Sequence, residues 1–472
     1  MNQLHQHFKN TLMNTFKIAA VLITSLFIFI SCDTDTDEQE DMEEAGYSIP
    51  VEGRLTVDPE LDDTGDYSGI NVRILNIFEP ETDTLYHAVT DSSGYFSGYA
   101  DFMERGEYLM EIRRGGNEIA SANLILAQND TIRIESELPD FDEQTQITSR
   151  EFEANNEYQR LMNQFTRVST YINAGLIDEE ESLENLYTWN ELFWDMSQNY
   201  EGTLAADRAL IQAVGILQDW DNEKMFEQLG AHPDNEALIE AGLYHGVPVR
   251  ITEGGLDAGL EYMDTLRERS QHSGNRQLVG IHRIEMLYDS SRVDQAKEHL
   301  SEFREEFGDD PGVQDWITSI AYDLENLAPG MEVPDFTISL LQGDQVTKED
   351  LAGRPFIIEF VNFEDPNYQF SFPVLRDIYD QYREDELQIL TIPTHENTST
   401  VQGFVDDNDL PWYMADAGVY SDENLIESFN VDQIPVRVLV NAEGRIVRKY
   451  YEAGVQELEL DLSQQRHQTD IL

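Results

Sequence analysis

The chain has 472 residues, of which 93 are Asp or Glu and 30 are Lys or Arg, so its formal net charge is -63 at pH 7. Binding of nucleic acid phosphates needs clustered positive charge, and nucleic acid is therefore excluded as a partner. Hydrophobic residues make up 40% of the chain, which is enough for packed cores and argues against general disorder. The length predicts several domains.

The acidic composition has two interpretations. An acidic surface of this kind repels itself unless salt screens it, so we interpret it as a solvated surface suited to a salty, halophilic habitat. Capture of divalent cations or of a basic partner is the alternative. The histidines match no metal-binding spacing, and the sequence predicts neither a metal site nor a cofactor.

Residues 1–31 have the layout of a secretory signal peptide. A positive leader without acids is followed by an apolar run, 18–30, that is too short to cross a bilayer comfortably. The small Ser31 before Cys32 resembles the lipobox of bacterial lipoproteins. That resemblance implies that Cys32 is acylated and anchors the chain to a membrane. An ordinary secreted protein with an incidental cysteine is the alternative.

Residues 32–48 are predicted to form an acidic tether. Their alternating acids do not make an EF-hand, because Glu38 stands where that loop needs glycine. Acids directly after the cysteine resemble the surface-export signals of Bacteroidota lipoproteins. The resemblance implies an exported protein that is lipid-anchored to the cell envelope, at the outer membrane, with display at the cell surface as a further option.

Residues 49–140 are predicted to form a β-sandwich module. Runs such as 70–75 and 108–112 are rich in apolar and β-forming residues, and 91–94 has the chemistry of a hairpin turn. The stretch resembles the carboxypeptidase regulatory-like modules of exported Bacteroidota proteins. The resemblance implies a structural or adhesive role, and we find no reactive constellation here.

Residues 147–328 are predicted to be α-helical. Leu300, Phe303 and Phe307 recur at helical spacing, and the turn residues 308–312 separate this helix from the next. The pair resembles a tetratricopeptide-like hairpin, although no regular repeat occurs. Ala328-Pro329-Gly330 then breaks the helical pattern and marks the start of a third domain.

Residues 330–472 are predicted to be an α/β domain. The apolar run 356–361 is typical of a buried central strand. The expected order is a helix near 371–383, a strand at 387–392, a helix near 399–407, a hairpin over 436–451 and a closing helix near 455–465. That order, with the lead-in at 351–355 and Gln433-Ile434-Pro435-Val436, resembles TlpA-type thioredoxin-like (redoxin-like) domains and their cis-proline loop.

The resemblance implies a redox site that this chain cannot supply. TlpA-type domains carry Trp-Cys-x-x-Cys between the central strand and its helix, and the first cysteine attacks as a thiolate. Alignment of the helix residues 372–375 places the two cysteine positions at Asp365 and Tyr368. The only cysteine of the chain is Cys32. We therefore expect no thiol-disulfide activity and no catalytic residue.

Asp365 has two interpretations. With Glu364 it could act as a paired acid and base, but we favour a helix cap, which needs no partner. We interpret His395, after the next strand, as a loop histidine without a nucleophile beside it.

The region around the two cysteine positions, where this chain has no cysteine, gives one binding hypothesis. A groove for a peptide would be formed by Asp365, Tyr368, Trp412, Ile434 and Pro435, with a cis bond before the proline. In the alternative, Tyr368 and Trp412 cover a core.

The sequence as a whole predicts a multidomain protein with a binding or scaffolding role. Its expected partners are the membrane, through lipidated Cys32, and a peptide or envelope protein. The alternatives are an oxidoreductase-related protein that acts with a partner's thiol, and a purely structural surface lipoprotein.

Overall fold

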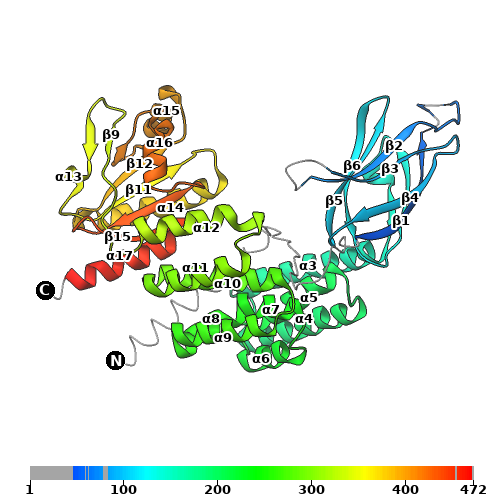
Figure 1. Cartoon of the computed structure of the whole chain (residues 1–472), viewed down its shortest axis with the longest axis horizontal. Coiled ribbons are helices and arrows are strands. Elements are labelled where there is room, and N and C mark those ends of the chain that lie inside the picture. Colours follow the sequence, from blue (N-terminus) through cyan, green and yellow to red (C-terminus); the bar gives the residue numbers. More distant parts are fainter. Residues whose placement is uncertain (1–45, 59, 62, 78–82, 452–453, 470–472) are drawn as a thin grey trace. The chain divides into compact units, whose positions relative to one another are not determined.

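A computed structural model describes residues 46–58, 60–61, 63–77, 83–451 and 454–469. Cys32, the signal peptide and most of the acidic tether lie outside the described residues. The chain divides into two compact units that meet in sequence between Val279 and Gly280, and Figure 1 labels their elements. In the part that the structure describes, no helix combines the length and the apolar character needed to cross a membrane.

The first unit begins with two four-stranded sheets, ordered β4-β1-β7-β8 and β3-β2-β5-β6. β1 pairs antiparallel with β4 and parallel with β7, so the first sheet is mixed. The predicted strands at 70–75 and 108–112 correspond to β2 and β5. The elements are β1 (Tyr47–Val57), β2 (Ile70–Asn76), β3 (Asp83–Val89), β4 (Tyr95–Phe102), β5 (Gly106–Arg114), β6 (Asn117–Leu126), β7 (Ile132–Leu138), α2 (Phe141–Gln144) and β8 (Gln146–Thr148).

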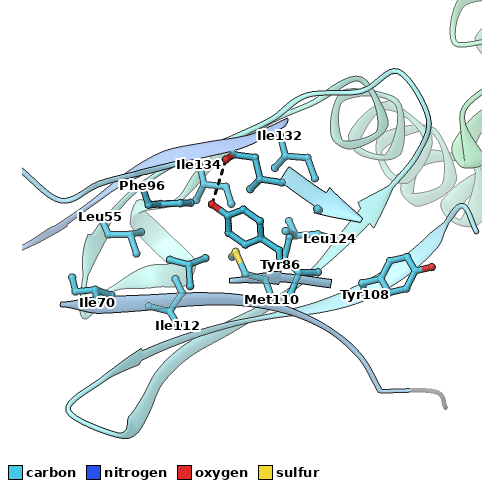
Figure 2. Close-up of a cluster of buried hydrophobic side chains, with 14 of the residues drawn as sticks. Leu55, Ile70, Tyr86, Phe96, Tyr108, Met110, Ile112, Leu124, Ile132 and Ile134 are labelled. Carbon is cyan, nitrogen blue, oxygen red and sulfur yellow. Dashed lines mark hydrogen bonds between the residues drawn. The ribbon is translucent and has the colours of Figure 1, made fainter. Parts of the chain in front are cut away.

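Both sheets contribute side chains to one hydrophobic cluster, shown in Figure 2. Leu55 comes from the first sheet and Ile70 from the second, and both are fully buried. Tyr86 lies inside the cluster, and its hydroxyl donates to the backbone carbonyl of Val51 at 3.3 Å. A buried tyrosine thus keeps a partner for its polar tip.

The helical region follows, and most of its helices begin at side-chain caps. Ser149, Asp178, Thr203, Asp221 and Asn235 each accept a backbone N–H at the start of a helix. The helices are α3 (Arg150–Asn173), α4 (Glu179–Asn199), α5 (Leu204–Leu217), α6 (Asn222–Ala231), α7 (Glu236–Ala241), the π-helical η1 (Gly242–Gly246), α8 (Val247–Gly254), α9 (Leu256–Arg269) and α10 (Ser273–Asp289).

The second unit consists of the end of α10, further helices and a five-stranded sheet ordered β13-β12-β11-β14-β15. β11 pairs parallel with β12 and antiparallel with β14. Its elements are α11 (Val293–Phe307), η2 (Pro311–Val313), α12 (Gln314–Tyr322), η3 (Asp323–Leu327), β9 (Thr337–Ser339), β10 (Gln345–Thr347), α13 (Lys348–Leu351), β11 (Phe356–Val361), α14 (Pro366–Tyr382), η4 (Arg383–Asp385), β12 (Gln388–Pro393), α15 (Thr398–Asn408), β13 (Tyr413–Met414), η5 (Val419–Ser421), α16 (Glu423–Ser428), β14 (Val436–Val440), β15 (Ile446–Tyr451) and α17 (Val455–Thr469).

The predicted elements of this domain are confirmed in their order, but the start of α14 is corrected and several short elements were not predicted, among them α13, β13 and α16. α14 begins at Pro366, five residues before the predicted start at 371, because Asp365 caps it and proline suits the first helical turn. The two-residue strand β13 was not predicted, because such a short edge strand carries no apolar periodicity.

The last helical segment belongs to the core of the sheet. Leu327 of η3 packs in the same hydrophobic cluster as Phe356 and Phe360 of β11. Asp323 of η3 lies 3.0 Å from Lys449 of β15, and both side chains are almost completely buried. Residues 328–330 therefore mark a change of secondary structure inside a unit whose packing begins near residue 280.

Candidate functional site

The residues at the two cysteine positions lie at the start of α14, after the central strand β11. Asp365 is the N-cap of this helix, and its carboxylate accepts the backbone N–H groups of Asn367 at 2.8 Å and Tyr368 at 3.0 Å. The negative charge also suits the positive end of the helix dipole. The interpretation of Asp365 as a cap is confirmed.

Tyr368 points into the domain and not into solvent. Its side chain is 1% exposed, and its ring lies against Phe363, Phe372 and Phe404 with centroids 5.6 to 6.2 Å away. Burial raises the pKa of its hydroxyl well above the usual value. The hypothesis that Tyr368 is an accessible aromatic anchor is wrong, because its ring completes an apolar cluster.

Trp412 is also part of a core. It is 8% exposed, and its indole N–H donates to the hydroxyl of Thr391 at 3.0 Å. Its ring packs edge-on against Tyr379 at 5.2 Å and Phe372 at 6.2 Å. The polar tip of the indole is satisfied inside the domain, and Trp412 does not line an open groove.

The loop before β14 has the backbone that the sequence predicts. The peptide bond between Ile434 and Pro435 is cis. Pro435 is buried and Ile434 is half-buried, whereas the preceding Asp432 and Gln433 are exposed. Of the five groove residues predicted, only Asp365 and Ile434 are therefore partly accessible.

His395 lies in the loop between β12 and α15, as predicted. It is half-buried, and its ring stacks on Phe363 with centroids 4.7 Å apart. With Phe404 on Phe363 as well, aromatic rings fill the space beside the start of α14.

An ion pair that the sequence analysis missed lies beneath the start of α14. Glu359 of β11 and Arg437 of β14 are directly opposite each other in the strand register. Arg437 Nε lies 3.0 Å from Glu359 Oε2, and both side chains have no exposed surface. Each is a single charge within an otherwise apolar strand, which is the signal that could have indicated a pair.

Polar neighbours complete this ion pair. Thr391, opposite Glu359 on β12, donates its hydroxyl to Glu359 Oε1 at 2.6 Å. Arg437 Nη2 donates to Ser371 Oγ of α14 at 2.9 Å. The guanidinium also lies 5.9 Å from the centre of the Tyr368 ring. A buried pair is tolerated when hydrogen bonds satisfy the remaining lone pairs and protons, as they do here.

The outer face of α14 exposes one large apolar residue near the cap. Phe370 is 63% exposed, and Pro366, Asn367 and Pro373 beside it on the helix are also exposed. The sequence analysis did not single out Phe370, because its position in the helix could not be assigned to a face while the start of α14 was placed too late.

The site holds no thiol, since the only cysteine of the chain is Cys32. Among the described residues, no three His, Cys, Asp or Glu side chains form a group that could hold a metal ion.

Comparison with known proteins identifies the fold of this region. A family model described as thioredoxin-like matches residues 353–446. The thiol-disulfide oxidoreductase ResA of Bacillus cereus is 26% identical over 128 residues, which are 27% of this chain and 72% of the relative. ResA of Halalkalibacterium halodurans is 26% identical over 129 residues, 27% of this chain and 70% of the relative.

Solved structures are similar over a comparable share of the chain. The thioredoxin domain of a thiol-disulfide oxidoreductase from Bacteroides vulgatus is 20% identical, covers 28% of this chain and 96% of its own, and has a TM-score of 0.26. A putative thioredoxin from Neisseria meningitidis is 23% identical, covers 30% of this chain and 93% of its own, and has a TM-score of 0.27.

The C-terminal region is thus a thioredoxin-like domain related to thiol-disulfide oxidoreductases. With a single cysteine, the chain has no Cys-x-x-Cys pair.

Replacement of Arg437 by methionine should destabilise the second unit strongly. The change leaves the Glu359 carboxylate buried without its cation, which typically costs about 3–5 kcal/mol of unfolding free energy. Chemical denaturation of the full chain measures this. The control is Arg383→Met, which removes an exposed arginine that pairs with Asp380 at 3.6 Å and should cost less than about 1 kcal/mol. Equal losses in the two variants would contradict the role of the buried pair.

Proposed function

We propose that this chain is a cell-envelope protein whose thioredoxin-like domain binds a peptide or protein partner and performs no thiol-disulfide exchange. One observation carries the proposal. Where a redox site would need two thiols, the chain has a carboxylate that caps α14 and a tyrosine that is buried over an ion pair. Thiolate attack requires a cysteine, and neither position has one.

The accessible residues around this position favour binding. Asp365 and Ile434 remain partly exposed beside the cis-proline loop. Phe370 adds a large apolar side chain on the outer face of α14. Aromatic residues, phenylalanine among them, are enriched in protein interfaces. The proposed binding surface therefore consists of Asp365, Phe370 and Ile434, without Tyr368 and Trp412.

The remaining parts of the chain fit an envelope location. We propose that residues 49–140 are a β-sandwich spacer, that residues 32–48 are an acidic tether, and that acylated Cys32 anchors the protein to the outer membrane. The net charge of -63 favours a salty surrounding.

A second candidate function is that of an oxidoreductase-related protein that works with a partner's thiol. The observation that favours it is that the relatives are thiol-disulfide oxidoreductases.

An insulin-reduction assay separates the two candidates. We expect no activity above that of buffer with dithiothreitol, because the chain has no thiol outside Cys32. A Cys32→Ser variant should give the same result. Turnover by the purified wild type, or by this variant, would exclude the binding-only function.

Replacement of Phe370 by serine should reduce partner capture several-fold. Capture from envelope extract is compared among the wild type, Phe370→Ser and the control Leu460→Ser, which changes a leucine of similar exposure (58%) on α17. Both variants should keep the melting temperature, because each residue is largely exposed. Equal capture by all three proteins would reject this surface.

Mass spectrometry of the mature N-terminus tests the anchor. We expect a lipid-modified peptide that begins at Cys32, because Cys32 follows a short apolar run and a small residue. An unmodified N-terminus beyond residue 32, on protein released into the medium, would show ordinary secretion.

A further inference from the structure

A cavity of about 440 Å³ lies in the second unit, and its walls come from α10, α12, β15 and the loop that leads to cis Pro435. Tyr451 at the end of β15 is the register partner of Val436, the residue after this proline. The cavity therefore lies at the same end of the sheet as the cis-proline loop. Its size suits a side chain or a small ligand.

Two cations line the cavity, and both are already paired. Arg448 Nε lies 3.3 Å from Asp461 Oδ2. Lys449 Nζ lies 3.0 Å from Asp323 Oδ2 and donates to the backbone carbonyl of Asn430 at 2.7 Å. Arg448 also lies near Asp289 and donates to its backbone carbonyl at 3.4 Å, and its charge acts to lower the pKa of the Asp289 carboxyl.

Four further carboxylates line the cavity, and within the described chain none of them has a lysine or arginine at ion-pair distance. They are Glu285, Asp289, Asp432 and Glu457. Asp432 accepts a hydrogen bond from the hydroxyl of Ser319 at 2.7 Å, which leaves its charge uncompensated. The cavity thus carries excess negative charge.

Glu285 is the least exposed of these four carboxylates, and it is half-buried in the wall. One of its oxygens accepts the indole N–H of Trp316 at 3.1 Å, and the other has no protein partner among the described residues. Burial raises the pKa of Glu285 to about 7, as expected for a carboxylate with no cation beside it.

The walls favour an organic cation over a metal ion. In the part of the chain that the structure describes, no three metal-ligating side chains are close enough to hold a metal. The cavity is instead lined by aromatic rings, among them Trp316, Tyr288 and Tyr451. Aromatic rings together with carboxylates recognise ammonium and guanidinium groups, through cation–π contacts and charge-assisted hydrogen bonds.

We propose that this cavity binds the side chain of an arginine or lysine from the partner segment that docks on the cis-proline loop. The inference rests on the proposed function, which supplies a peptide partner, and it adds that the partner is basic. Glu285 is the deeper acceptor for the cation, and the exposed Asp432 lies on the loop itself.

The test uses the full chain and the probe N-acetyl-arginine amide, with binding measured by calorimetry. N-acetyl-citrulline amide, which has the same shape without the charge, is the control probe. Glu285→Gln keeps the acceptor for the Trp316 N–H and removes the charge. Glu298→Gln, an exposed glutamate on α11 away from the cavity, is the matched control variant. Asp432→Asn is a second cavity variant on an exposed loop, should Glu285→Gln fail to fold.

We expect the arginine probe to bind the wild type and Glu298→Gln equally, and to bind each cavity variant at least tenfold more weakly. The citrulline probe should bind the wild type at least tenfold more weakly as well. Equal binding of both probes, equal binding by wild type and both cavity variants, or no binding by the wild type would overturn the cavity site. Partner capture that still depends on Phe370 would then show that the proposed function holds without the cavity site. Loss of that dependence with retained probe binding would reject the proposed function alone.

Discussion

The Glu359–Arg437 ion pair is the constraint on which the thioredoxin-like domain depends. It joins the central strand β11 to β14, and Arg437 reaches Ser371 on α14. A buried charge that loses its partner costs several kcal/mol, so the two residues must be kept or lost together. Glu359 has no exposed surface, and its two oxygens accept hydrogen bonds from Arg437 and Thr391. The carboxylate therefore joins the strands inside the domain and does not face a ligand.

Aromatic side chains pack above this ion pair, so a partner can contact the domain only at its surface residues. Tyr368, Phe363 and Phe404 fill the space beside the start of α14, so this space is closed to a partner. Around it, Asp365 caps α14, Phe370 is exposed on the same helix, and the cis-proline loop leads into β14. The loop is fixed from the other side as well, because Asn430 donates to Asp323 of η3 at 2.7 Å. A surface supported by packed elements suits recognition better than one on a free loop.

Much of this architecture could be predicted from the sequence, but the orientation of individual side chains could not. The apolar run of β11, the Asp365 cap and the cis-proline loop each follow from local residue chemistry, and each is confirmed. Tyr368 was placed correctly at the start of the helix after β11, but spacing along a chain does not say whether an aromatic ring points out or in. The ion pair of Glu359 was missed because strand register, which brings residues 78 positions apart together, is not visible in one sequence.

The burial of Tyr368 also limits which substitutions the domain tolerates at the two cysteine positions. A cysteine at 368 would remove the whole aromatic ring from a packed cluster, and the cavity left behind would destabilise the fold. A cysteine at 365 would replace the carboxylate that accepts two backbone N–H groups at the start of α14. Either substitution to cysteine alone therefore lowers the stability of the domain, and a single cysteine does not yet form a dithiol. Substitutions to cysteine at these two positions are therefore disfavoured, whereas substitutions at the exposed positions of α14 cost little stability.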